Sequence, residues 1–178
     1  MEEELIEVLD ENGLKTGVIK KKSDIKKDGD FHQAISVIVL NKNKEVLIHK
    51  RSSKKKIYPD LWSIFIRGHV TAHETTIDSC IRELNEEIAL KIKKEDLIYL
   101  YSRKEEDKNK EYINNLFYEN YLLITDIDEI NYNEEISEVK FIKINELKEK
   151  IIVDRKSFVP NDEDYNIIFN KLNVFKED

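Results

Sequence analysis

Residues 74–90 constrain the fold of this chain more than any other segment, because two stripes of side chains run along them. Apolar residues recur there at helical spacing and predict one buried helix face. They are Ile77, Cys80, Ile81, Leu84 and Ile88. Glu83, Glu86 and Glu87 follow an i, i+3, i+4 pattern, which puts three carboxylates within one arc of about 100° on the helix surface. The segment predicts a helix over Glu74–Leu90.

Three like charges at this spacing repel one another, so the acidic stripe calls for positive compensation. Arg82 is adjacent in the sequence, but one guanidinium cannot neutralise three carboxylates. Divalent cations such as Mg²⁺ bind through oxygen ligands and can do so. The alternative is an acidic helix face that is simply solvated, and the triplet taken alone leaves both readings open.

Strands and helices both occur outside this helix, and the pattern indicates an α+β or layered α/β/α domain. Asn12-Gly13 predicts the turn of a hairpin, and an apolar, β-branched run predicts a strand covered on both faces. The expected strands are Leu5–Leu9, Thr16–Ile19, Ala34–Leu40, Glu45–Lys50, Leu97–Ser102, Ile113–Thr125 and Glu138–Ile142, and a charged loop is expected over Lys104–Glu111. Two further helices are expected, one capped by Asn145 and ending near Ile151, the other over Asp162–Leu172. One domain is expected over residues 1–178, with 1–30 as an N-terminal hairpin extension.

Composition narrows the classes of partner. The formal net charge of -7 argues against a nucleic-acid binder, because phosphate contacts need a basic surface. No apolar run reaches the roughly 20 residues that span a bilayer. Cys80 is the single cysteine, so no internal disulfide can form and a cytoplasmic protein is expected. The sequence does not fix the oligomeric state, and a homodimer is one state that it allows.

The spacing of the glycine, acidic and arginine residues over 68–90 resembles the Nudix box, G-x5-E-x7-R-E-U-x-E-E-x-G-U. Gly68 is followed after five residues by Glu74 and after seven more by Arg82-Glu83-Leu84. Every position matches except the second glycine, which is Ala89 here. The resemblance implies a Nudix fold, an α/β/α sandwich with a mixed β-sheet, and a hydrolase that cleaves a diphosphate linkage with Mg²⁺ or Mn²⁺.

The same resemblance implies a set of residue roles. Glu83, Glu86 and Glu87 correspond to the metal ligands, and Glu83 or Glu87 to the base that activates water. Arg82 corresponds to a residue that orients a neighbouring glutamate, Glu74 to a supporting group, and Gly68 to a position of close backbone approach. Such enzymes often recruit a further acid, for which Glu134, Glu135 and Glu138 are the candidates, with Glu135 first. Arg67 and Arg51 are candidate phosphate ligands.

Ala89 stands where the box has a glycine that follows the helix. If alanine keeps the left-handed conformation, it costs about 1–2 kcal/mol. The other expectation is that the helix continues by another turn towards Lys91. Neither outcome removes a metal ligand.

The chain also resembles the isopentenyl-diphosphate-isomerase-like branch of Nudix proteins. This resemblance rests on DENG near the start, Phe31-His32, Lys50-Arg51, the segment 58–62 and Gly68-His69-Val70. Three departures count against isomerisation: Arg67 replaces a catalytic cysteine, the run Tyr112-Ile113-Asn114-Asn115 lacks an essential acid, and Ile25 replaces a histidine. The hydrolase glutamates are intact. Isomerase activity and a catalytically silent diphosphate-binding module are the alternatives to a hydrolase of a nucleoside diphosphate derivative or related organic diphosphate.

Overall fold

The computed structural model describes residues 3–108, 113–127 and 129–173. In this part of the chain four α-helices accompany the strands, so the α+β class with a mixed sheet is confirmed. Within the same residues, each helix is too short or too polar to cross a bilayer.

The chain folds into two compact units, each assembled from three segments. The first comprises Met1–Val37, Arg67–Glu83 and Ile92–Tyr121, and the second Ile38–Ile66, Leu84–Lys91 and Leu122–Asp178. The expectation of a single domain over 1–178 stays a prediction.

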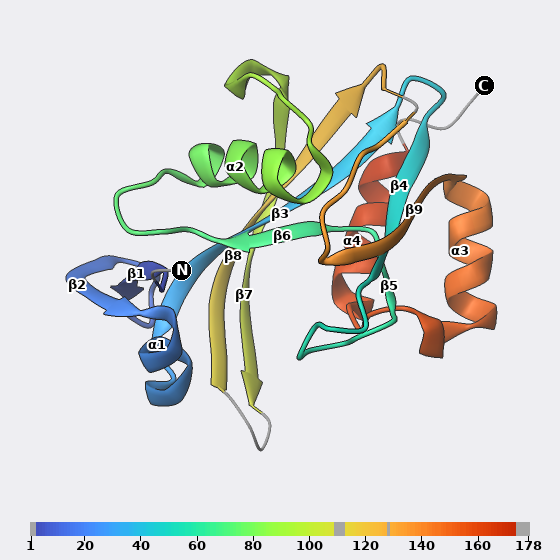
Figure 1. The fold of residues 1–178 in the computed structure, drawn as a ribbon. Helices are drawn as coiled ribbons and strands as arrows, with labels where there is room; N and C mark the ends of the chain where they lie inside the picture. The colour runs from blue at the N-terminus through green and yellow to red at the C-terminus, as the bar shows by residue number, and fades with distance from the viewer. Residues whose placement is uncertain (1–2, 109–112, 128, 174–178) are drawn as a thin grey trace. The chain divides into compact units, whose positions relative to one another are not determined.

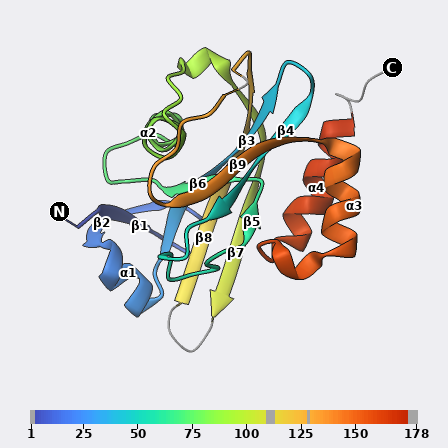
Figure 2. The ribbon, with the colours of Figure 1, turned by 45° about the vertical axis from the view of Figure 1, so that its right-hand side comes forward.

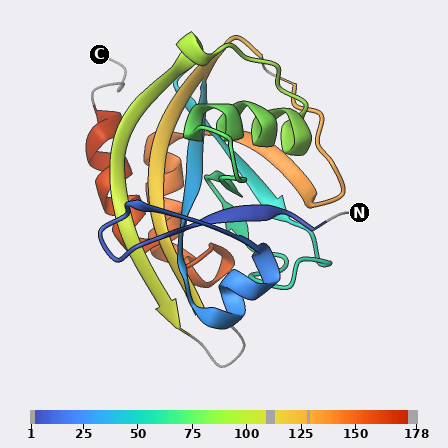
Figure 3. The ribbon, with the colours of Figure 1, turned by 90° about the vertical axis from the view of Figure 1, so that its left-hand side faces the viewer.

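The first unit is built on long strands (Figure 3). Its elements are β1 (Leu5–Leu9), β2 (Lys15–Lys21), α1 (Lys22–Asp28), the start of β3 (Phe31–Asn41), β6 (Ile66–His69), most of α2 (Thr76–Ile88), η1 (Lys94–Asp96), β7 (Leu97–Lys108) and most of β8 (Ile113–Thr125). Strand β8 pairs with β3 and β7, and β6 pairs with β3. Segments distant in the sequence thereby lie on neighbouring strands.

The predicted N-terminal hairpin is confirmed. Gly13 takes a φ of 83° between β1 and β2, a conformation that glycine adopts without steric cost. Helix α1 was not expected after the hairpin, because its seven residues contain a single apolar side chain, Ile25, which is too few to show a helical period.

Strand β7 extends further than the sequence predicts. The charged run from Lys104 indicates a loop, but β7, which pairs with β8, continues to Lys108. Lys104 lies over the Phe31 ring with its Nζ 4.4 Å from the ring centre. Residues 109–112 of the expected loop lie outside the described residues.

The second unit surrounds β4 (Figures 1 and 2). Its other elements are β5 (Trp62–Ser63), β9 (Ile136–Lys143), α3 (Ile144–Val153), η2 (Arg155–Ser157) and α4 (Asp162–Leu172), with the ends of β3, α2 and β8. Strand β4 (Glu45–Arg51) runs antiparallel to β9 along its length and to β5 at His49 and Lys50. Helices α3 and α4 lie side by side and bury Leu147 and Ile168.

The sequence predicts one of the two C-terminal helices more accurately than the other. Helix α4 has the predicted bounds. The predicted cap of α3 is wrong, because the cap position is Lys143 and makes no side-chain hydrogen bond. Asn145 lies inside the first turn, since the apolar Ile144 is buried at the start of the helix.

Candidate active site

The start of α2 is fixed by two sets of side-chain hydrogen bonds. The Thr75 N–H donates to Asp78 Oδ2 and the Asp78 N–H donates to Thr75 Oγ1, both at 3.1 Å, which is a capping box. Thr76 Oγ1 and the Tyr121 hydroxyl both donate to Glu119 Oε2, at 2.6 and 2.5 Å. Helix α2 is therefore tied to β8 at its first residue.

Arg82, in the next turn of α2, forms several hydrogen bonds to neighbouring residues. Its guanidinium donates to Glu74 Oε1 at 3.1 Å, to Glu83 Oε1 at 2.7 Å and to the His69 carbonyl at 3.1 Å. Ser79 Oγ donates to Glu74 Oε2 at 2.6 Å. One arginine thus joins the loop after β6 to two acidic side chains of the predicted site.

These contacts fix the ionisation of Glu74 and Arg82. Burial opposes the charge on Glu74, but hydrogen bonds from Arg82, Ser79 and Thr71 outweigh it and lower the pKa of that carboxyl to about 2. Burial also opposes the charge on Arg82, but the contacts with Glu74 and Glu83 raise the pKa of its guanidinium. Both groups are charged at neutral pH.

Glu83 packs directly on the backbone of Gly68. A Cβ built on Gly68 would lie 2.1 Å from Glu83 Oε1 and 2.2 Å from its carboxyl carbon. Any larger residue at position 68 would have to displace this carboxylate. The glycine is needed here for close approach and not for a positive φ.

The rest of the acidic stripe belongs to the last turn of α2. Glu87 is 9% exposed, as Glu83 is, whereas Glu86 is exposed. The helix ends at Ile88, and Ala89 keeps the left-handed conformation with a φ of 53°. Of the two expectations for this position, the strained alanine is therefore correct.

Glu135 lies on a loop that is bonded to the end of α2. The Asn133 N–H donates to the Glu87 carbonyl at 3.0 Å, and Asn133 Oδ1 accepts from the Glu135 N–H at 2.9 Å. The Glu135 carboxylate is half exposed and forms an ion pair with Lys55. The loop is connected to the acidic stripe through its backbone, while the carboxylate itself pairs with a lysine.

The two candidate phosphate ligands have different surroundings. Arg51 donates through Nε and Nη2 to the Ile57 carbonyl and through Nε to the Tyr58 carbonyl, at 2.8–3.2 Å, so it holds the loop that follows β4. Arg67 is half-buried, donates to Ser36 Oγ at 3.4 Å and lies over the Tyr118 ring. Arg67 thus lies on the face of a strand, whereas Arg51, at the end of β4, is bonded to the loop that follows it.

The two histidines that match the isopentenyl-diphosphate-isomerase-like branch, His32 and His69, lie next to each other. The His32 and His69 rings stack with their centres 5.2 Å apart. Burial lowers the pKa of His32 to about 4 and that of His69 well below its usual value. Both rings are neutral at neutral pH. Ile25 packs in the core with Ile6 and Val8, and Tyr112 lies outside the described residues.

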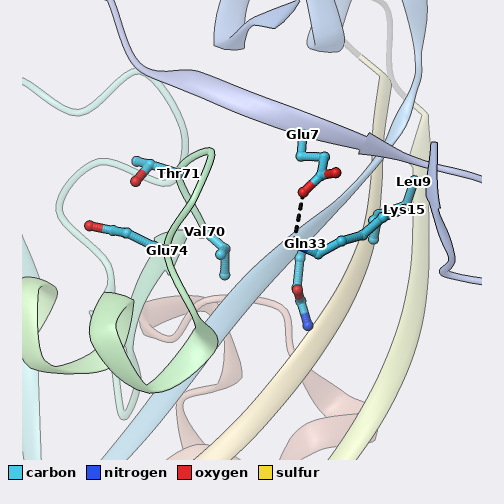
Figure 4. A pocket seen from close by; sticks show the side chains of 7 residues that line it. All are labelled: Glu7, Leu9, Lys15, Gln33, Val70, Thr71 and Glu74. Atoms are coloured by element: carbon cyan, nitrogen blue, oxygen red, sulfur yellow. Dashed lines mark ion pairs between the residues drawn. The ribbon is translucent and has the colours of Figure 1, made fainter. Parts of the chain in front are cut away.

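A polar hollow opens beside the box residues (Figure 4). It is shallow, with about 10 Å³ of enclosed space, and is lined by Glu7, Leu9, Lys15, Gln33, Val70, Thr71 and Glu74. Glu7 and Lys15 form an ion pair of 2.8 Å across it. Its lining comes from the hairpin and β3 as well as from the box, which no local motif predicts.

The carboxylates of α2 are oxygen donors of the kind that divalent metals bind. Among the described residues, no three His, Cys, Asp or Glu side chains are gathered closely enough to hold an ion. The acidic stripe nonetheless supplies oxygen donors on one helix, two of them largely buried, and Gly68 leaves room for the Glu83 carboxylate. Carboxylate oxygens are the donor type that Mg²⁺ and Mn²⁺ prefer.

Comparison with known proteins identifies the family. The NUDIX domain profile matches residues 30–162, so the chain belongs to the NUDIX domain family. A Deinococcus radiodurans protein of known structure, DR0079, superimposes with a TM-score of 0.67 at 18% identity, over 85% of this chain and 90% of its own. This likeness shows the shared fold.

Two curated relatives differ in their named activities. Nudix hydrolase 3 of Arabidopsis thaliana is 32% identical over 91% of this chain, but the chain spans only 22% of that protein. An isopentenyl-diphosphate Delta-isomerase of Photorhabdus laumondii is 29% identical over 83% of this chain and 84% of its own length.

Proposed function

We propose that this chain is a divalent-metal-dependent Nudix pyrophosphohydrolase. Its substrate is a nucleoside diphosphate derivative or a related organic diphosphate. The observation that carries the proposal is the Glu74–Arg82–Glu83 network, in which Glu83 lies against Gly68 on the helix that also bears Glu86 and Glu87.

The proposed metal ligands are Glu83, Glu86 and Glu87. When bound, Mg²⁺ or Mn²⁺ neutralises charge that develops on the diphosphate and its leaving group. Arg82 holds Glu83 in position through a bond of 2.7 Å, so metal binding has to compete with this guanidinium for one carboxylate oxygen. Arg82 acts as a positioning residue in this scheme.

The remaining proposed roles concern water and phosphate. Glu83 or Glu87 accepts the proton of the attacking water, and both carboxylates are shielded from bulk solvent, which strengthens that interaction. Arg67 and Arg51 are proposed to bind phosphate oxygens. For Arg51, this requires the guanidinium to release or share the carbonyls of the loop at Ile57 and Tyr58. Glu135 is the proposed additional acid, and it must first release Lys55.

A phosphate-release screen with Mg²⁺ tests the activity. The panel is nucleoside triphosphates, nucleotide sugars, dinucleotides, coenzyme A and isopentenyl diphosphate. Glu83→Gln and Glu87→Gln are expected to lower turnover about a hundredfold or more, because each removes a proton acceptor or ligand. Glu95→Gln is the matched control, since this glutamate lies on η1 with its side chain 63% exposed. Turnover that survives excess chelator, or a Glu83→Gln, Glu87→Gln double variant with full activity, would contradict the proposal.

Isomerisation is the second candidate, favoured by the similarity to isopentenyl-diphosphate Delta-isomerases and the His32–His69 stack. Conversion of isopentenyl diphosphate to its isomer without phosphate release would support it. Binding without any turnover would support a silent diphosphate-binding module.

A further inference from the structure

The shallow hollow of Figure 4 opens on the same face of the strands as the Glu83 carboxylate. The Cβ position of Gly68 points at Glu83, and Val70, two residues further along, lines the hollow. The Val70 N–H donates to the Gln33 carbonyl at 3.0 Å, which continues the pairing of β6 with β3. Because alternate residues of a paired strand point to the same side, Gly68 and Val70 face the same way.

One guanidinium connects the hollow to the proposed reaction centre. Glu74 lines the hollow, and Arg82 donates to Glu74 Oε1 at 3.1 Å and to Glu83 Oε1 at 2.7 Å. A single side chain therefore bridges the wall of the hollow and a proposed metal ligand. A substrate whose diphosphate lies at Glu83 can reach the hollow with a group attached to that diphosphate.

Backbone contacts hold the two walls of the hollow together. Ile6 of β1 forms a bridge with Thr71, and the Ala72 N–H donates to the Leu5 carbonyl at 2.7 Å. These contacts dock the loop after β6 on the N-terminal hairpin. The walls are in place before a ligand binds, which lowers the entropy cost of binding.

The size of the hollow limits the group that it can hold. Its enclosed part measures about 10 Å³, and a space of about 10–15 Å³ on this measure holds one water molecule. Two of the lining residues, Leu9 and Val70, are apolar and buried. A single hydroxyl or amino group therefore fits the enclosed part, while the ring that carries it lies across the open mouth.

The polar lining of the hollow offers acceptors to such a group. The Lys15 ammonium pairs with Glu7 Oε2 at 2.8 Å, and Oε1 is a second acceptor on the same carboxylate. Gln33 donates through Nε2 to Glu119 Oε1 at 3.2 Å, so the other end of this amide is an acceptor. The Lys15 side chain is 62% exposed, and an ion pair this exposed contributes little stability. A ligand can therefore share Glu7 at low cost.

The charges of the hollow disfavour an anion. Among the lining side chains, Glu7 and Glu74 are negative and Lys15 is positive. Arg82 also pairs with Glu74 but shares its charge with Glu83, so the balance stays negative. A further phosphate or carboxylate would be repelled here, whereas a hydroxyl or amino group can form a charge-assisted hydrogen bond to Glu7.

One wall of the hollow comes from outside the hydrolytic motif. Strands β1 and β2 supply Glu7, Leu9 and Lys15, whereas the NUDIX profile match begins at residue 30. The chemistry of this wall can change without altering the residues proposed for hydrolysis. Such a position suits a residue that selects substrates.

We propose that Glu7, in this hollow, binds a hydroxyl or amino group on the organic part of the substrate and so selects which diphosphates are hydrolysed. The inference rests on the proposed hydrolase function. It narrows the substrates to diphosphates whose organic group donates a hydrogen bond at this position and carries no negative charge there.

Substrate pairs that differ in one donor group test this proposal. ATP and 2′-deoxy-ATP differ by a hydroxyl, ATP and ITP by an amino group, and UDP-glucose and UDP-xylose by a hydroxymethyl group. Wild type is expected to prefer the donor-bearing member of at least one pair. Glu7→Ala is expected to lower kcat/KM for that member about ten- to hundredfold, the usual effect of losing a hydrogen bond to a charged group, and to change the other member less than about twofold. The pair that responds distinguishes a hydroxyl from an amino group.

Glu4→Ala is the matched control. Glu4 pairs with Lys22 at 2.7 Å, much as Glu7 pairs with Lys15, but Glu4 lies outside the lining of the hollow. Its loss is expected to change both members of a pair equally. Glu7→Gln, which keeps a carbonyl acceptor but loses the charge, is expected to fall between wild type and Glu7→Ala and serves if the alanine variant folds poorly. Equal losses for both members in Glu7→Ala, or equal kcat/KM for both members of every pair in wild type, would overturn the proposal.

Binding measured without turnover separates this inference from the hydrolase proposal. The same compounds are titrated against thermal unfolding of a Glu83→Gln, Glu87→Gln variant with and without Glu7→Ala, since a ligand bound to the folded state raises Tm. If wild type hydrolyses no diphosphate but a donor-bearing compound raises Tm only when Glu7 is present, the hydrolase proposal fails and the donor site stands. If hydrolysis occurs but the Tm shifts do not depend on Glu7, the donor site fails.

Discussion

The two ends of α2 are held by different means, although they belong to one helix. At the first turn, side chains do the work: Thr75 and Asp78 cap the helix, and Arg82 reaches back to Glu74. At the last turn, a backbone hydrogen bond holds the end of the helix. The Ala89 N–H donates to the Asn85 carbonyl at 3.1 Å, in the simple left-handed C-terminal motif.

The two ends of α2 also differ in their charged side chains. Arg82 forms ion pairs with Glu74 and Glu83. Glu86 and Glu87 lie in the last turn, whose own residues include no basic side chain. Carboxylates near a helix C-terminus oppose the macrodipole. The first turn of α2 is therefore stabilised by side-chain capping, whereas the last turn places two carboxylates where the helix dipole disfavours them.

Gly68→Ala is expected to have the largest effect on this arrangement. The new Cβ would collide with Glu83 Oε1, and overpacking of this kind costs about 2–3 kcal/mol. Urea unfolding measures the loss, and phosphate release should fall with it. Gly17→Ala is a control for glycine removal in open space, although its positive φ makes some loss expected. Normal activity and stability in Gly68→Ala would show that the Glu83 carboxylate can shift away from position 68 without loss.

Glu74→Gln is expected to cost about 1.5–3 kcal/mol at neutral pH, the value of hydrogen bonds to a charged group. The pKa of Glu74 is lowered to about 2 from 4.5, so its stabilisation is fully present above pH 4.5 and is lost as the pH falls towards 2. The difference in unfolding free energy between wild type and variant should shrink over that range. A difference that stays constant from pH 7 to pH 3 would separate Glu74 from the stability of the first turn.

Thr75→Ala is expected to destabilise the protein by about 1 kcal/mol, because it removes the capping acceptor of the Asp78 N–H. Chemical denaturation measures this. Thr125→Ala, outside any helix, provides the comparison. A loss below that of the comparison variant would mean that the contacts of Thr76 with β8 hold the first turn by themselves.

Glu86→Gln is expected to raise stability by about 0.5 kcal/mol, because it removes a negative charge from the C-terminal turn. Turnover should fall if Glu86 binds metal. The combination of a higher Tm and lower activity distinguishes a ligand from a merely solvated carboxylate. Unchanged turnover would remove Glu86 from the site.

Ala89→Gly is expected to give the smallest change, a gain of about 0.5 kcal/mol. Relief of the left-handed strain is worth about 1–2 kcal/mol, and the greater freedom of glycine in the unfolded chain offsets part of it. Thermal unfolding measures the gain, and Ala89→Val should lose stability. Equal stability of alanine and glycine would place the strain elsewhere in the turn.

Several elements were predicted well because their signals are local. The period of α2, the Asn12-Gly13 turn and the acidic start of α4 each lie within a few residues, and the structure confirms these elements. Helix α1, the extension of β7 and the cap of α3 were missed or misplaced, because burial of Ile25, pairing with β8 and burial of Ile144 depend on residues elsewhere in the chain.

The sequence by itself determined the acidic stripe, since the spacing of Glu83, Glu86 and Glu87 on a helix follows from the helical repeat alone. Only the tertiary structure decided that Glu83 rests on Gly68 and that Arg67 and Arg103 meet around Tyr118. These contacts join strands and helices far apart in the sequence, and strand pairing and close packing, which no local pattern encodes, bring them together.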